Sequence, residues 1–126
     1  MEREAFIRNI AEARWHELPG HHGGALSKLL VHPEATASRE LDFRISCYAP
    51  MACVARHKHQ VQEQIYHVLE GEGLMEIGNT SRVVRKNDFV FLPPGVDHSL
   101  QNSGTGNLVF LVITSPVSDE PNVAPR

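Results

Sequence analysis

A chain of 126 residues is long enough for one domain with a single hydrophobic core. Hydrophobic residues make up 41% of it and charged residues 21%, as in ordinary globular proteins, and a formal net charge of −3 gives no basic surface for nucleic acid or anionic lipid. No apolar run approaches the roughly 20 residues that cross a membrane. The first eight residues also lack the apolar core of a signal peptide, so we expect a cytoplasmic protein.

The first 24 residues are expected to form an arm outside the main domain. Residues 1–14 place Phe6, Ile10 and Ala13 on one side of an amphipathic helix. A strand that packs on a partner subunit fits the same segment, and the pattern does not choose between the two. Residues 15–24 contain Pro19 and three glycines and are expected to be a loop.

Many short strand-like runs at close spacing follow, as in an all-β sandwich or barrel. They cover residues 25–31, 41–48, 53–57, 64–70, 73–77, 80–85, 89–92, 98–102 and 107–114. No helical pattern separates them, which excludes a parallel α/β sheet. A two-sheet jelly roll over residues 25–115 protects the edges of such strands. Residues 116–126 contain three prolines and no apolar pattern, and are expected to form a loose tail.

In two of these runs the apolar pattern also indicates what each face of the strand contacts. Residues 41–48 are apolar at every odd position, so Arg44 and Tyr48 lie on the polar face. We expect Arg44 to be solvated; if its face lines the cavity, its guanidinium is instead placed to clamp a carboxylate. Residues 108–113 are apolar on both faces and need cover outside the barrel as well as inside. That cover is either the N-terminal arm or, as we expect, a second copy in a homodimer.

Two stretches of the chain contain side chains suited to binding a metal ion. His57 and His59 are two residues apart on a strand, so both imidazoles point to the same side. Gln64 opens the next strand, and His98 follows a Pro-Pro-Gly turn far along the sequence. Such side chains meet at one ion only if the sheet closes on itself. The set therefore predicts a closed barrel together with one divalent metal ion per chain.

These stretches resemble the two motifs of the cupin superfamily, Gly-x5-His-x-His-x3–4-Glu-x6-Gly and Gly-x5-Pro-x-Gly-x2-His-x3-Asn. The second motif is present from Pro93 to Asn102, with Asn87 in place of its opening glycine. In the first motif Met51 replaces the opening glycine, which puts a turn geometry in doubt. The resemblance covers residues 51–102 and implies a jelly-roll double-stranded β-helix. It also implies that the metal ligands are His57, His59, Gln64 and His98.

Gln64 stands where the motif has an acidic ligand, with six residues between it and Gly71. Four neutral ligands leave the full +2 charge of a divalent ion in the site, so the ion is a stronger Lewis acid for anionic oxygen ligands. An imidazole-rich set favours Zn, Ni, Cu or Fe over Mn. In the alternative arrangement Glu63 is the fourth ligand, although strand alternation and the spacing to Gly71 oppose it.

Strand alternation also predicts the cavity beside the ion. Its expected lining is mostly apolar, apart from the ligands, and consists of Cys53, Ala55, Tyr66, Val68, Leu100 and Asn102. Tyr66 is the candidate catalytic residue, as a hydrogen-bond donor or weak acid, and its alternative role is to fill the core.

The remaining histidines and the two cysteines are not expected to be metal ligands or to form a disulfide. Five histidines match no ligand spacing and are expected to be structural or solvated: His16, His21, His22, His32 and His67. Cys47 and Cys53 are expected to be free thiols.

A fold and a metal site do not select a reaction, so three functions remain open. The first, which we favour, is a Lewis-acid isomerase or lyase acting on a small, anionic, oxygen-rich substrate such as a sugar acid. The second is a dioxygenase with a redox-active metal. The third is a non-catalytic protein that binds a small ligand or senses metal.

Overall fold

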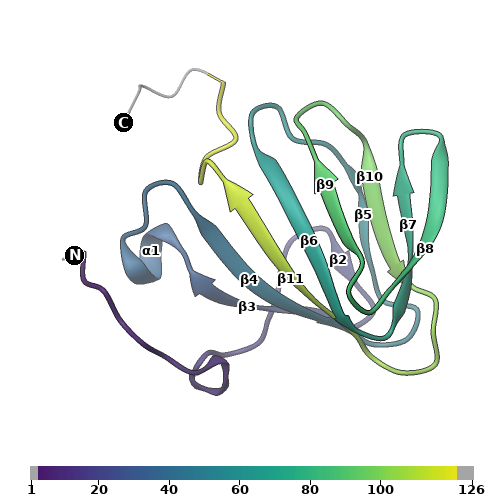
Figure 1. Cartoon of the computed structure of the whole chain (residues 1–126), viewed down its shortest axis with the longest axis horizontal. Helices are drawn as coiled ribbons and strands as arrows, with labels where there is room; N and C mark the ends of the chain where they lie inside the picture. The colour runs from purple at the N-terminus through teal and green to yellow at the C-terminus, as the bar shows by residue number, and fades with distance from the viewer. Residues whose placement is uncertain (1–2, 122–126) are drawn as a thin grey trace.

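Two antiparallel sheets face each other in the computed structural model, which describes residues 3–121 (Figure 1). The strands are β1 His16–Glu17, β2 His21–His22, β3 Ala25–Val31, β4 Asp42–Tyr48, β5 Cys53–His57, β6 Glu63–Glu70, β7 Glu72–Ile77, β8 Thr80–Arg85, β9 Phe89–Leu92, β10 His98–Asn102 and β11 Leu108–Ser115. The six-stranded sheet has the order β1-β3-β4-β11-β6-β9, and the five-stranded sheet has the order β2-β5-β10-β7-β8. This arrangement is consistent with the expected jelly roll.

The nine strands expected from the sequence are confirmed, each within one residue at either end. Helices contribute only a 3-10 turn, η1 Ile10–Glu12, and one α-helical turn, α1 Pro33–Thr36, to the described residues. No helix among residues 3–121 is long and apolar enough to span a membrane.

The core lies between the two sheets and is built around aromatic side chains. Tyr48 of β4 and Tyr66 of β6 both pack against Phe110 of β11, with ring centroids 5.0 and 5.4 Å apart. All three are nearly inaccessible to solvent. The side chains that border the site are therefore held by a close-packed interior, which limits their rotamers.

Two turns between strands keep a left-handed backbone conformation although the residue there is not glycine. Met51 and Asn87 stand where glycines were expected, and both have left-handed backbone conformations, with φ of 72° and 69°. Gly71, between β6 and β7, has φ of 80°, and a Cβ there would collide with the Asn107 carbonyl oxygen. The turn geometry that Met51 put in doubt is thus retained.

The amphipathic helix considered for residues 1–14 is wrong over the described part of that segment. Only η1 forms, capped by the Asn9 side chain. Phe6 and Ile7 remain exposed, so the segment has no buried apolar face to support a longer helix. Lys28 of β3 instead holds the arm, because its Nζ donates to the Ile10 carbonyl oxygen at 3.0 Å. The loop expected after it contains the short strands β1 and β2, which pair with β3 and β5.

The division into arm, barrel and tail remains a prediction. Residues 122–126 of the expected tail lie outside the described residues. Residues 116–121 follow a cis peptide bond between Ser115 and Pro116 and contact the loop between β5 and β6, as described below.

Candidate metal centre

Three histidines from separate parts of the chain meet at one end of the barrel. His57 ends β5, His59 lies in the loop that follows, and His98 begins β10 directly opposite His57 in the strand register. One ligand nitrogen from each of the three lies within 4.8 Å of the others. The structure therefore brings together the three imidazoles singled out in the sequence, with a spacing that suits a metal ion.

Hydrogen bonds orient two of these rings. The Nδ1 atom of His57 donates to the Ala55 carbonyl oxygen at 2.7 Å, and that of His98 donates to the Val96 carbonyl oxygen at 3.0 Å. Each bond fixes the tautomer, so that the lone pair is on Nε2, the nitrogen left for a metal. The backbone of each histidine's own strand or turn thus orients a ligand.

Burial favours the neutral form of His98 and His59, the form that coordinates a metal. It lowers the pKa of His98 to about 4, and the neighbouring His57 and His59 act in the same direction. Burial, followed by the charge of His57, also lowers the pKa of His59. Metal binding at neutral pH therefore need not displace a proton from either ring.

Gln64 lies beside His59 and lines the same cavity as His57 and His59. Its Nε2 donates to Thr114 Oγ1 of β11 at 3.1 Å, which orients the amide, and its Oε1 is buried with no hydrogen-bond partner among the described residues. Glu63, the alternative fourth ligand, is exposed and is not part of the cluster. This placement favours Gln64 over Glu63.

Unpaired polar atoms gather at this point of the molecule. Within residues 3–121, four buried side-chain atoms lack a partner, and three of them are His59 Nε2, Gln64 Oε1 and His98 Nε2. Leaving such groups unpaired in a buried place costs free energy, and one cation in contact with all three removes that cost. The donor set of imidazole nitrogens and an amide oxygen suits a borderline divalent ion. The residues present therefore fit a metal ion.

Asp119 connects residues 116–121 to this cluster. Its carboxylate accepts hydrogen bonds from the backbone N–H groups of Gln60, Val61 and Gln62 at 2.8–3.1 Å, and its Oδ2 lies 3.7 Å from His59 Nδ1. Although partial burial acts in the opposite direction, these N–H groups lower the pKa of Asp119. A carboxylate far along the chain thus holds the loop that carries one ligand.

Replacing Asp119 by alanine is expected to weaken metal binding about 10–100-fold, the effect typical of losing a partner of a ligand histidine. Asp119→Asn retains one oxygen for the loop N–H groups and should lose less. Competition with a zinc-binding dye measures both variants. If Asp119→Ala binds zinc as tightly as the wild type, Asp119 does not position His59.

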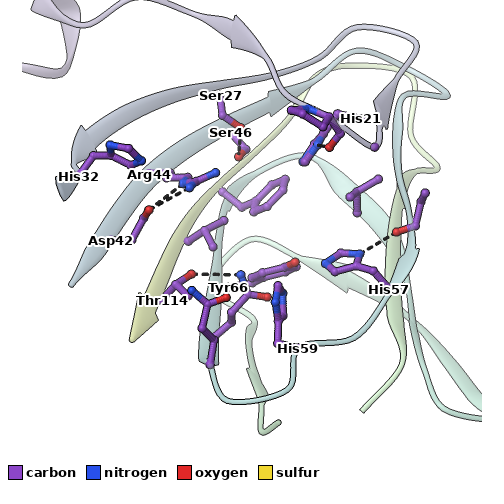
Figure 2. Close-up of a pocket in the computed structure, with 18 of the residues that line it drawn as sticks. His21, Ser27, His32, Asp42, Arg44, Ser46, His57, His59, Tyr66 and Thr114 are labelled. Atoms are coloured by element: carbon purple, nitrogen blue, oxygen red, sulfur yellow. Dashed lines mark hydrogen bonds and ion pairs between the residues drawn. The ribbon is translucent and has the colours of Figure 1, made fainter. Parts of the chain in front are cut away.

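A cavity of about 390 Å³ opens beside the cluster, within the range of small-molecule sites (Figure 2). Its lining contains polar side chains that the sequence did not predict. One wall, contributed by β3 and β4, has the polar side chains of Ser27, Asp42, Arg44 and Ser46. The expectation of a solvated Arg44 is wrong for the same reason: the polar face of β4 lines the cavity, and the apolar odd positions face outward.

A strand irregularity changes another part of the lining. The pairing of β5 with β10 shifts register between His57 and Val54, so Val54 faces the cavity along with His57. Cys53, which was expected there, is not among the lining residues. Both cysteines are free thiols, as expected. His21 and His32, which match no ligand spacing, line the cavity but are not part of the histidine cluster.

Tyr66 occupies the position expected of it. Its ring lies 6.2 Å from that of His98, centroid to centroid, and borders the cavity. Burial raises the pKa of its phenol above the usual range, and the positive charge of Arg44 opposes this only partly. The hydroxyl therefore stays protonated and is available as a hydrogen-bond donor.

Comparisons with known proteins agree with this geometry. Residues 44–114 match the family described as Cupin domain. An uncharacterized protein of Methanocaldococcus jannaschii is 30% identical over 93 residues, 74% of each chain. An oxalate-binding protein of Thermotoga maritima is 28% identical over 104 residues, which is 82% of this chain and 86% of that one. The crystal structure of a predicted oxalate decarboxylase from Thermotoga maritima superposes with a TM-score of 0.79 at 25% identity, and the alignment covers 87% of this chain and 98% of that one. The chain belongs to the cupin family.

Proposed function

We propose that this protein is a metal-dependent isomerase or lyase that acts on a small, anionic, oxygen-rich substrate such as a sugar acid. The observation that carries the proposal is the uncharged donor set of His57, His59, His98 and Gln64, gathered with unpaired atoms beside a cavity. A divalent ion held there, with Zn, Ni, Cu or Fe favoured over Mn, keeps its full charge and supplies Lewis-acid chemistry to an anionic ligand.

The chain's own residues supply binding and orientation. Tyr66, with its hydroxyl protonated, donates a hydrogen bond to an oxygen of the bound substrate and has the geometry for a weak general acid. Val54 and Phe110 give the cavity an apolar side that excludes water from the reacting atoms. Thr114 holds the Gln64 amide in one orientation.

A non-catalytic binding role is the second candidate, and one observation favours it. The carboxylate of Asp42, which borders the cavity, is tied to Arg44 by two hydrogen bonds of 2.7 and 2.8 Å and is a poor general base in that state. The Thermotoga maritima relative, an oxalate-binding protein by its printed name, is consistent with a small anion as ligand.

One experiment separates these functions. Protein loaded with zinc, nickel or iron is mixed with galacturonate in D₂O, and NMR follows the exchange of carbon-bound hydrogen while an electrode records oxygen. Metal-dependent exchange supports the isomerase or lyase, and Tyr66→Phe should slow it about 100-fold. Metal-dependent binding without exchange identifies a binding protein, and oxygen uptake identifies a dioxygenase.

We also propose that the protein is a homodimer joined through the outer face of the six-stranded sheet. A row of apolar side chains crosses four neighbouring strands of that face, with Phe43, Ile113, Ile65 and Phe91 in register. Ile113, Ile65 and Phe91 are exposed by 37%, 40% and 53%. Residues of the arm and of β3 line one pocket with Phe43, whereas Ile113, Ile65 and Phe91 are not among its lining residues. Contiguous exposed apolar surface of this kind is typical of an interface.

Light scattering at micromolar concentration is expected to return twice the chain mass of 14.0 kDa. Ile113→Asp places a charge in the middle of the row and should shift the protein to the monomer. Thr80→Asp, on the other sheet, is the matched control and should leave the dimer intact. A monomer mass for the wild type contradicts the proposal.

A further inference from the structure

The cavity has two walls of different chemistry. Figure 2 shows His57 and His59 on one side and Arg44, Ser27 and Ser46 on the other, with Tyr66 between them. The second wall belongs to β3 and β4, whose inward-facing residues Ser27 and Ser46 are direct neighbours in the strand register. Nothing in the metal chemistry uses these side chains.

The charge of Arg44 is already matched within this wall. Its Nε and Nη2 atoms donate to the two carboxylate oxygens of Asp42 at 2.7 and 2.8 Å. Asp42 is buried, whereas the Arg44 side chain is 30% exposed, so solvent reaches one side of the pair. Two of the five guanidinium N–H groups are used in this way, which leaves three to donate to a ligand. The wall has hydrogen-bond donors but no net charge.

The two serines add a second hydrogen-bonding point. Ser27 Oγ and Ser46 Oγ lie 2.8 Å apart, and both residues are almost fully buried. A hydrogen bond between two hydroxyls uses only one of their two O–H hydrogens. The other hydrogen, and lone pairs on both oxygens, remain for a ligand group in the cavity that both residues line. A hydroxyl, which donates and accepts, can use both the free O–H and the lone pairs of this pair, whereas a carboxylate, which only accepts, can use the free O–H alone.

We propose that this wall binds uncharged hydroxyl groups of the ligand, while the ligand's single acid group lies at the imidazole end. The wall consists of Arg44, Asp42, Ser27 and Ser46. The proposal rests on the proposed function and narrows its substrate class to monocarboxylates with a hydroxylated tail. Positive charge is concentrated at the metal end, and the far wall is neutral, so a second carboxylate gains nothing there. A cavity of about 390 Å³ also leaves ample room beyond a two-carbon acid such as oxalate.

Four acids test this assignment by calorimetric titration of zinc-loaded protein. Oxalate provides an acid group without a tail, hexanoate an apolar tail, adipate a second carboxylate, and gluconate a hydroxylated tail. Gluconate is expected to bind about tenfold or more tightly than hexanoate or adipate, the gain from one or two added hydrogen bonds.

Two substitutions in the wall locate the effect. Arg44→Met should weaken gluconate about tenfold and leave hexanoate unchanged within about twofold. Because that change leaves the Asp42 carboxylate unpaired and threatens folding, Ser46→Ala is the second variant, with an expected loss for gluconate alone of about threefold or more. Arg82→Met, an exposed arginine on β8, is the matched control and should change neither acid.

The outcomes separate this proposal from the one it rests on. If none of the four acids binds more tightly to zinc-loaded than to metal-free protein, the proposed function itself fails. If the acids bind in a zinc-dependent manner but adipate equals or exceeds gluconate, the neutral wall is overturned. The neutral wall is also overturned if Arg44→Met and Ser46→Ala both bind gluconate as tightly as the wild type does.

Discussion

Replacing His57 and His59 together by alanine is expected to reduce the bound metal from about one ion per chain to none while the barrel stays folded. The two residues supply two of the three clustered imidazoles, and the remaining ligands do not form a chelating pair on one strand. Neither residue belongs to the hydrophobic core, so the packing between the sheets is unaffected. Elemental analysis of the purified variant measures the metal, and circular dichroism measures the fold.

The matched control for this variant is the double substitution His16→Ala and His22→Ala. These two exposed histidines lie on β1 and β2, outside the cluster. The control should keep its full metal content. Full occupancy in the His57 and His59 variant, with the fold preserved, contradicts the assignment of the metal centre.

The second large effect is expected at Gln64, where this chain departs from the common cupin motif. Glutamate has nearly the same shape as the glutamine it replaces in Gln64→Glu. In the wild type the Thr114 hydroxyl accepts a hydrogen bond from the Gln64 amide, and in the variant it is able to donate one to the new carboxylate. The added negative charge should raise the affinity for hard ions such as Mn. It should also weaken the binding of anions, because the net charge of the site falls from +2 to +1.

Two further variants show which residue is the ligand. Gln64→Ala should loosen the metal about tenfold or more without unfolding the domain, since three imidazoles remain. Glu63→Ala is the matched control, because its side chain is exposed one residue away. Titration of all three with manganese, zinc and a small dicarboxylate measures these effects. If Glu63→Ala loses metal and Gln64→Ala keeps it, the fourth ligand is a carboxylate after all.

Much of the fold was predictable because its signals are local. Strand positions such as 53–57 and 98–102 follow from short runs bounded by turn residues, and the structure has β5 and β10 at those bounds. The arm was not predictable in the same way. Lys28 holds it through the Ile10 carbonyl oxygen, and such a contact between distant residues leaves no periodic pattern in the sequence.

The clustering of the three histidines was predictable for a different reason. His57, His59 and His98 stand at motif spacings that the fold brings to one point. The polar wall was not predicted, because the alternation of side chains along β4 defines two faces but does not show which of them points into the barrel. Phe43 and Ile45 lie on the outer face of β4, and Arg44 and Asp42 could be placed in the cavity only with the fold in view.

Two further residues of the site could not be predicted from the alternation of side chains along a strand. Val54 replaces Cys53 in the cavity because a register shift breaks the two-residue period of β5. Asp119 reaches the His59 loop across more than 50 residues of sequence, from a segment with no apolar pattern. Asp119 stands next to a second carboxylate, Glu120, and the local pattern does not mark either of them as the one that contacts the loop.

Anomalous X-ray scattering from crystals of the zinc-loaded protein tests the central claim most directly. The expected result is a single peak per chain at the zinc edge, about 2.0–2.2 Å from Nε2 of His57, His59 and His98 and from Oε1 of Gln64. A peak bound through Glu63, or no peak within reach of the three imidazoles, contradicts the account.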